Sequence, residues 1–225
     1  MNKVKDMVAL WNTDSTEIRD MSHCKGFGRW EDSNWSNSLG SEMVIRCRKL
    51  MLMFGHNPNN WNPRVIDFGC GGGSNLMVLR GELCGVDISR TNIIEARKQN
   101  PWADYVLYDP EYPEDLINDI PFIADVFIST YVFQHFPSKD YTKHVINLMT
   151  HMVKKGGLFL VQFRHNNDNP TKFTNLKYAD GYVKASRMHP NDFKNWLEVQ
   201  GFSVVYEEKQ VGSNDYMWFG GSRIK

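Results

Sequence analysis

The chain alternates between short apolar runs and longer stretches in which apolar residues recur every three or four positions. The short runs predict buried β-strands, and the periodic stretches predict amphipathic α-helices. The strands are expected at 64–68, 83–87, 103–108, 123–130 and 158–163, and the helices at 90–99, 138–153 and 190–200. Two further strands, 202–208 and 216–223, flank a turn and predict an antiparallel hairpin. This order predicts an α/β domain with a mostly parallel sheet.

Residues 1–60 do not follow this alternation. Tryptophan and phenylalanine residues punctuate polar, glycine-containing sequence there. One helix is expected at 41–54, where Ser41 can cap the N-terminus and Gly55 marks the end. Taken singly, each tryptophan is best explained by packing against the domain. As a group they favour a helical and aromatic cap that lies over a binding site.

The segment 65–75 joins a predicted strand to a cluster of glycines and leads into helical spacing at Leu76, Val78 and Leu79. Glycines allow a ligand to approach the main chain closely. The first amide groups of the following helix are then expected to point toward that ligand. The dinucleotide pattern G-x-G-x-x-G is incomplete, because Ser74 stands in its third position. A turn that binds no ligand is the alternative explanation of this segment taken alone.

Two acidic residues stand at the ends of predicted strands, 20 positions apart. Asp67 lies two residues before the first glycine, where a carboxylate repels a pyrophosphate and attracts a cationic amino-acid ligand. Asp87 ends the next strand, and a carboxylate in that place can accept hydrogen bonds from both hydroxyls of a ribose. Asp87 therefore predicts an adenosine-containing ligand, and Asp67 favours one that carries a positive charge.

The strand expected at 123–130 leads into a segment with candidate chemistry. Ligands of open α/β sheets bind outside the carboxyl ends of the strands, and His135 follows that end of this strand. A histidine there can remove a proton from an acceptor hydroxyl or amine near neutral pH, or it can shape the pocket by packing. Its polar neighbours are expected to line the ligand side (Ser129, Thr130) and the acceptor side (Tyr131, Gln134).

Several segments together resemble one protein family. Residues 67–73 (DFGCGGG) match the D-x-G-x-G-x-G motif of the class I S-adenosylmethionine-dependent methyltransferases. Asp125 and His135 are similar to an acid–histidine pattern that many small-molecule members carry around the fourth strand. The turn at 154–157 (KKGG) between a helix and a strand, and the closing hairpin, also resemble the family. The resemblance covers roughly residues 64–225.

The resemblance implies both a fold and a cofactor. The fold is a three-layer Rossmann-like sandwich whose mostly parallel seven-stranded sheet ends in an antiparallel hairpin, preceded by an N-terminal helical lid. The cofactor is S-adenosyl-L-methionine, with Asp67 at its methionine part and Asp109 at its adenine, although Asp109 is also part of a common turn pair. The predicted cofactor-binding residues are Asp67, Gly69, Cys70, Gly71, Gly73, Asp87, Ile88, Asp109, Ser129 and Thr130.

Acceptor-binding residues are expected around the fifth strand and in the N-terminal segment. Residues 165–189 break the β-α rhythm, at a place where the family usually inserts substrate-binding structure. We therefore divide the chain into a cap segment at 1–60 and a methyltransferase domain at 61–225 that contains this insertion. The predicted catalytic residues are His135 and Tyr131. The predicted substrate-binding residues are Gln134, Arg164, His165, Trp30 and Tyr178, with a solvated loop as the alternative for Arg164 and His165.

Composition narrows the class of protein. The 225 residues suffice for one α/β domain, and 26 basic against 26 acidic residues give no electrostatic reason to expect a nucleic-acid or membrane-surface partner. The four cysteines form no C-x-x-C pair, which favours reduced thiols in a cytoplasmic protein. We expect no signal peptide, no membrane-spanning segment and no metal site.

The sequence as a whole predicts an enzyme that transfers a methyl group to an oxygen or nitrogen of a small organic or sugar-like acceptor. In-line displacement needs mainly alignment of the acceptor and exclusion of water. Three alternatives stay open: a methyltransferase of RNA or protein, a nicotinamide-dependent oxidoreductase, and a non-catalytic regulatory protein that binds the cofactor.

Overall fold

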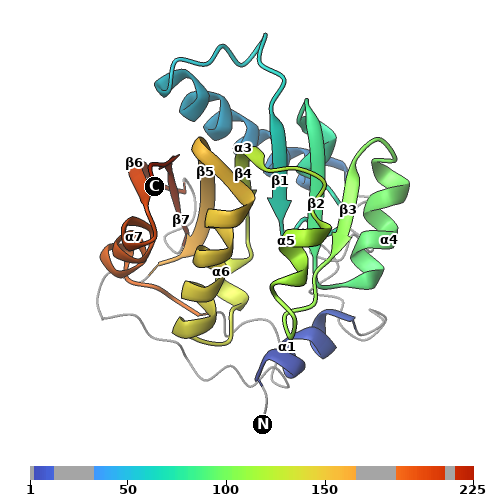
Figure 1. Cartoon of the computed structure of the whole chain (residues 1–225). Coiled ribbons are helices and arrows are strands. Elements are labelled where there is room, and N and C mark those ends of the chain that lie inside the picture. The colour runs from blue at the N-terminus through green and yellow to red at the C-terminus, as the bar shows by residue number, and fades with distance from the viewer. Residues whose placement is uncertain (1–2, 13–32, 166–185, 211–215) are drawn as a thin grey trace.

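A computed structural model describes residues 3–12, 33–165, 186–210 and 216–225, which contain one seven-stranded sheet (Figure 1). The sheet order is β3-β2-β1-β4-β5-β7-β6. The first five strands pair in parallel, whereas β7 runs antiparallel to both β5 and β6. This confirms the predicted fold. The strands are β1 (Arg64–Phe68), β2 (Glu82–Asp87), β3 (Asp104–Leu107), β4 (Ala124–Ser129), β5 (Val153–Arg164), β6 (Phe202–Lys209) and β7 (Tyr216–Arg223).

The apolar runs mark the strands because the parallel strands are covered on both faces. In the central strand β4, all residues but Asp125 are buried. β5 begins five residues earlier than expected, at Val153 instead of Leu158. Its first residues, 154–156, are exposed and lie beside an irregular register with β4. A polar start of this kind leaves no apolar pattern from which a strand could be predicted.

Helices pack on both faces of the sheet and give two hydrophobic cores. One core joins a face of the sheet to α1 (Lys3–Asn12), α5 (Asp115–Asp119), α6 (Lys139–Met152) and α7 (Pro190–Val199). The other core joins the opposite face to α3 (Ser33–Met53), α4 (Arg90–Gln99) and the 3₁₀ turn η2 (Leu76–Val78). A second 3₁₀ turn, η3 (Phe133–His135), follows β4. This arrangement is the predicted three-layer sandwich.

Serine caps fix the starts of two helices. The hydroxyl of Ser89 accepts a hydrogen bond from the backbone N–H of Asn92, and Ser138 does the same for Tyr141. Each cap satisfies an N–H group that a helix terminus otherwise leaves unpaired. As a result, α4 and α6 begin close to where the sequence predicts them.

Four helical segments differ from expectation. The helix predicted after the glycine cluster is only the single turn η2, because β2 begins at Glu82 and leaves room for no more. The connection before β4 contains the short helix α5. The predicted helix at 41–54 is the second half of a longer helix, α3. The sequence predicted no helix over residues 3–12, where α1 forms.

The topology brings the candidate residues to one edge of the sheet. The carboxyl ends of β1, β2 and β4 lie side by side, because these strands are parallel neighbours. In Figure 1, α1 lies across this edge, below the ends of the strands. Over the described ranges of the chain, no helix is both long and apolar enough to span a membrane.

Candidate active site

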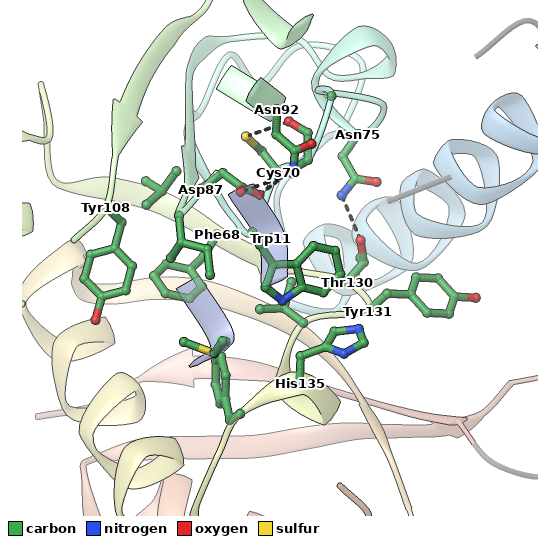
Figure 2. A pocket seen from close by; sticks show the side chains of 18 of the residues that line it. Trp11, Phe68, Cys70, Asn75, Asp87, Asn92, Tyr108, Thr130, Tyr131 and His135 are labelled. Carbon is green, nitrogen blue, oxygen red and sulfur yellow. Dashed lines mark hydrogen bonds between the residues drawn. The ribbon is translucent and has the colours of Figure 1, made fainter. Parts of the chain in front are cut away.

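A cavity opens at the carboxyl ends of β1, β2 and β4 (Figure 2). The space between its atoms, counted out to the open mouth and so including solvent, is about 960 Å³. Its walls are mostly apolar and aromatic. The residues that the sequence predicted and that line it are Gly69, Cys70, Gly71, Asp87, Ile88, Thr130, Tyr131 and His135.

The glycine loop forms the floor of the cavity. The backbone N–H groups of Gly69 and Cys70 both donate to the carbonyl of Val86, at 2.7 and 3.0 Å, which ties the loop to β2. Gly69 has a φ of +76°, and a Cβ there would lie 2.1 Å from a methyl carbon of Val132. Only glycine fits this position, since the loops after β1 and β4 touch there.

Asp87 is held in one orientation at the end of β2. One carboxylate oxygen accepts from the backbone N–H of Gly71 at 2.9 Å. The other accepts from the N–H of Ser89 at 2.8 Å and from the side-chain amide of Asn92 at 3.3 Å. Burial raises the pKa of Asp87, and these hydrogen bonds oppose the rise. The result is a fixed acceptor group on the cavity wall.

Asp67 lies behind the cavity wall. Its side chain is fully buried, and it is not one of the residues that line the cavity. The amide nitrogen of Asn75 connects it to the cavity, donating to Asp67 Oδ1 at 3.2 Å and to the hydroxyl of Thr130 at 2.9 Å. Within the described part of the chain, Asp67 Oδ2 has no hydrogen-bond partner. Burial raises the pKa of Asp67 to about 7, with the Asn75 bond opposing the rise and the nearby Asp87 adding to it.

Besides Asp67, three more of the predicted cofactor-binding residues lie off the cavity wall. The carbonyl of Gly73 accepts a hydrogen bond from Asn100, so this glycine packs against α4. The hydroxyl of Ser129 is buried and donates to the carbonyl of Phe68. Asp109 lines a neighbouring groove and accepts from the backbone N–H of Glu111, which is the turn role weighed for it in the sequence.

On the acceptor side, two predicted residues line the cavity. His135 packs edge-on against the indole of Trp11, with ring centroids 5.0 Å apart. The amide nitrogen of Gln134 lies 3.3 Å from Nε2 of His135, while Gln134 itself is fully buried. Tyr131 has a φ of +59°, a left-handed conformation that non-glycine residues rarely adopt. In Figure 2 its ring points away from Trp11 and His135.

The remaining predicted residues are not brought to the cavity. Arg164, at the end of β5, and the buried His165 do not line it. Asp125 lies at the opposite end of β4 from His135, where it accepts from the backbone N–H of Arg64 and pairs with Lys154. Trp30 and Tyr178 lie outside the described residues.

A family described as a methyltransferase domain matches residues 43–207 of the chain. The chain belongs to the class I S-adenosylmethionine-dependent methyltransferases. No curated protein matches this methyltransferase in sequence. The family match includes the glycine loop and the segment after β4, and it therefore covers the cavity floor and one wall.

Solved structures resemble this methyltransferase over its whole length. Magnesium protoporphyrin IX methyltransferase of Synechocystis PCC 6803, with bound S-adenosylmethionine, aligns with a TM-score of 0.64 and 16% identity over 99% of this chain and 98% of that one. The same enzyme with bound S-adenosylhomocysteine aligns with a TM-score of 0.60 and 19% identity over 94% and 100%. The N-methyltransferase NodS of Bradyrhizobium japonicum WM9, with S-adenosylhomocysteine, gives 0.60 and 10% over 100% of both chains. At these identities the likeness shows the fold.

S-adenosylmethionine is the cofactor of this methyltransferase, and the cavity suits it chemically. The cofactor carries a ribose, an ammonium and a sulfonium. Asp87 supplies a fixed acceptor for the hydroxyls of a ribose. Oδ2 of Asp67, which has no hydrogen-bond partner among the described residues, belongs to a buried carboxyl that pairs with a cation when it is ionised. Gly69 leaves the main chain open to close approach.

The predicted site residues of this methyltransferase leave out two residues that line the cavity, because these lie on α1, a helix that the sequence did not predict. Met7 and Trp11 both line the cavity. Asn12 fixes the end of this helix, since its amide donates to the carbonyl of Ile88 at 3.1 Å and its oxygen accepts from the N–H of Arg90 at 3.0 Å. The spacing of four positions between the two apolar side chains was the available signal. Asn75, Asn92, Val132, Phe136 and Tyr141 also line the cavity and were not predicted.

Proposed function

We propose that this methyltransferase acts on an oxygen or nitrogen of a small organic or sugar-like molecule. The observation that carries the proposal is the acceptor end of the cavity, where Trp11, His135 and Tyr131 supply aromatic walls. Among the described residues that line the cavity, there is no lysine or arginine. A nucleic acid requires a basic surface for its phosphates, so this lining favours a small acceptor.

On the cofactor side, we assign one role to each polar group. Asp87 accepts hydrogen bonds from the ribose, and the amide groups of the loop at Gly69–Gly71 lie along the main part of the cofactor. Asp67 and Asn75 attract the amino-acid end of the cofactor. The carboxyl of Asp67 acts on this end either directly or through Asn75, to which it is hydrogen-bonded. Gly73, Ser129 and Asp109 keep supporting roles in this proposal, because their contacts hold the loops around the cavity.

The reaction needs little covalent chemistry from the protein. When bound, the cofactor supplies a methyl group on a sulfonium, which is a good leaving group. The residues of the chain then bind the acceptor, align it with that methyl group and exclude water. The α1 helix contributes Met7 and Trp11 to this enclosure. Within the cap segment at 1–60, we assign to α1 the role of closing the cavity.

His135 is proposed to orient the acceptor more than to deprotonate it. In the tautomer that carries its proton on Nδ1, the amide nitrogen of Gln134 donates to Nε2 of His135 and occupies the lone pair that a base requires. His135 also packs against Trp11, which fixes the plane of its ring at the cavity wall. An acceptor that packs against these rings has a defined direction toward the cofactor.

A calorimetric titration tests the cofactor side of the proposal. The purified protein is titrated with S-adenosylmethionine, S-adenosylhomocysteine and NAD. We expect the first two to bind and NAD not to bind. The variant Asp87→Asn should weaken binding at least about tenfold, because hydrogen bonds to charged groups are worth about 1.5–3 kcal/mol. Asp104→Asn is the matched control, since Asp104 is an exposed aspartate on β3.

Turnover tests the acceptor side. Release of S-adenosylhomocysteine is measured with pools of small metabolites, total RNA and total protein as acceptors. Methylation confined to the small-molecule pool supports the proposal. Enzymatic methylation of RNA or protein, and not of small molecules, overturns the proposal in favour of an RNA or a protein methyltransferase. Cofactor binding without product from any pool indicates a regulatory protein.

A further inference from the structure

A buried glutamine on β5 connects the loop after β4 to the end of β6. The side chain of Gln162 is fully buried, and its neighbours along the strand, Val161 and Phe163, are apolar. An amide in such surroundings is costly unless its polar atoms are hydrogen-bonded. The oxygen of Gln162 accepts from the backbone N–H of Tyr131 at 2.9 Å, and its nitrogen donates to the side-chain oxygen of Gln210. Both ends of the buried amide are therefore used.

Tyr131 needs such a contact because its backbone conformation is strained. Its φ of +59° lies in the left-handed region, which a residue with a Cβ keeps only where its surroundings enforce it. The hydrogen bond from its N–H to Gln162 fixes the orientation of the peptide group that precedes the strained Cα. The side chain is held as well, since the amide nitrogen of Gln210 lies 2.9 Å from the hydroxyl of Tyr131. The two glutamines thus hold Tyr131 from two sides.

The residues on either side of Tyr131 form part of the cavity wall. The hydroxyl of Thr130 accepts a hydrogen bond from the amide of Asn75 at 2.9 Å (Figure 2). Val132 packs so closely against Gly69 that a Cβ on this glycine would lie 2.1 Å from a methyl carbon of the valine. The backbone angles of Tyr131 set the direction of the chain between these two contacts. A change to a negative φ would therefore move Thr130 or Val132 out of its contact.

The contact of Thr130 leads to the buried carboxyl behind the cavity wall. The amide nitrogen of Asn75 that donates to Thr130 also donates to Oδ1 of Asp67, at 3.2 Å. Two acceptors hold this one amide group, so the loss of either one leaves it less fixed. A continuous set of contacts thus runs from Gln162, through the strained loop, to Asn75 and Asp67.

We infer that Gln162 is a positioning residue for the cofactor. It keeps Tyr131 in the left-handed conformation, and Tyr131 in turn keeps Thr130 in contact with Asn75. Gln162 is not among the residues that line the cavity, so it acts through this loop. The inference rests on the proposed function, in which Asn75 and Asp67 attract the amino-acid end of the cofactor, and it adds a residue of β5 to that site. If Gln162 merely filled the interior of the sheet, the strain at Tyr131 would not matter.

A pair of substitutions separates these two roles by calorimetric titration with S-adenosylhomocysteine. Gln162→Leu keeps a side chain of similar size but removes both hydrogen bonds. It should weaken the affinity about tenfold, because Tyr131 is then free to leave its strained conformation. Tyr131→Gly relieves the strain, since glycine populates positive φ about as readily as negative φ. In the Tyr131→Gly background, Gln162→Leu should therefore weaken the affinity by no more than about twofold.

Gln210→Met provides a second arm if Gln162→Leu fails to fold, because Gln210 is half-buried and lies at the end of β6. It removes the partner that orients Gln162 and should weaken the affinity about threefold, again only while Tyr131 is present. Thr142→Val is the matched control. It removes a buried hydrogen bond on α6, away from the cavity lining, and should change the affinity less than about twofold in either background.

The outcomes distinguish the inference from the function on which it rests. Equal losses for Gln162→Leu in the two backgrounds show a purely structural glutamine and overturn the inference. No loss in the wild-type background overturns it as well. In both cases a wild-type protein that binds S-adenosylhomocysteine leaves the proposed function standing. A wild-type protein that does not bind S-adenosylhomocysteine contradicts the proposed cofactor site, and the inference with it.

Discussion

Burial has a strong electrostatic effect on Asp67, which lies behind the cavity wall. Its carboxyl is fully buried, one oxygen has a single partner in Asn75, and the other has none among the described residues. A buried carboxylate without a cation disfavours its own charged form, which is why its pKa rises to about 7. The ligand-free fold therefore carries an electrostatic cost that the cofactor can remove.

Asp67→Asn is expected to stabilise the ligand-free protein at neutral and alkaline pH. The folded protein holds a proton on Asp67 up to a pKa of about 7, whereas the unfolded chain loses it near pH 4. In the wild type, the stabilisation that the protonated carboxyl of Asp67 contributes is fully present below pH 4 and is lost as the pH rises through 7. The advantage of the variant in free energy of unfolding should thus grow by about 3 kcal/mol from pH 5 to pH 8, measured by urea denaturation. An advantage that does not change with pH contradicts this account.

For single residues, the sequence predicts the chemical type of the site better than it predicts which residues line the cavity. Asp87 and the loop at Gly69–Gly71 reach the cavity wall, as strand ends and glycine turns are expected to do. Ser129 and Gly73 are equally close in sequence but point into the packed interior. The side a residue faces depends on the twist of the sheet and the exact course of the loop. Neither of these is visible in a motif.

Among the elements, α1 is the one that depends most on tertiary contacts. A helix of ten residues is marginal by itself, so its docking must stabilise it. Met7 and Trp11 pack into the core, and Asn12 connects the helix to the junction of β2 and α4. Short amphipathic segments give little signal before the surface that they cover is known. This explains why the strands were predicted from sequence and α1 was not.

Asn12→Ala should loosen α1 without unfolding the sheet. The variant loses the hydrogen bonds to the carbonyl of Ile88 and the N–H of Arg90, each worth about 1 kcal/mol. Hydrogen exchange of the amides in residues 3–12 should therefore become faster, and the affinity for S-adenosylmethionine should fall about fivefold. Asn118→Ala, on the exposed side of α5, is the control. Unchanged exchange in residues 3–12 would show that Asn12 does not hold the helix.

The length of an element is set by its neighbours as well as by its own residues. The spacing of Leu76, Val78 and Leu79 indicates a helix, yet only one 3₁₀ turn forms. The parallel pairing of β1 with β2 requires the chain to return at Glu82, and this leaves no room for another turn. Pairing between strands is a long-range constraint, which local periodicity cannot reveal.

At the scale of the whole molecule, an ion pair that contains a buried arginine joins α3 to β6, on the face of the sheet opposite α6. Arg46 on α3 pairs with Glu208 on β6 at 2.8 Å and lies over the ring of Trp218 on β7. The side chain of Arg46 is only 7% exposed, while that of Glu208 is 30% exposed. This pair ties the N-terminal half of the chain to its last two strands.

Glu208→Ala should destabilise the whole molecule while leaving cofactor binding intact. The change leaves the guanidinium of Arg46 buried, with Glu42 as its remaining acidic partner among the described residues. Breaking a buried pair costs about 3–5 kcal/mol, and the partial exposure of Glu208 reduces the expected loss in free energy of unfolding to about 2 kcal/mol. Glu207→Ala, which breaks a more exposed pair with Lys194, should cost less than about 1 kcal/mol. Equal losses in the two variants, by urea denaturation, would contradict the burial argument.

In the proposed role of Asp67, cofactor binding replaces the proton on this carboxyl with the positive charge of the cofactor. A bound ammonium or sulfonium lowers the pKa of the carboxyl beside it, so a protein molecule that takes up the cofactor near pH 7 gives its proton to the buffer. Protons then compete with the cofactor, and acidification from pH 7 to pH 6 should weaken the affinity by about fivefold. The proposed role thus makes methylation sensitive to pH through a side chain that lies behind the cavity wall.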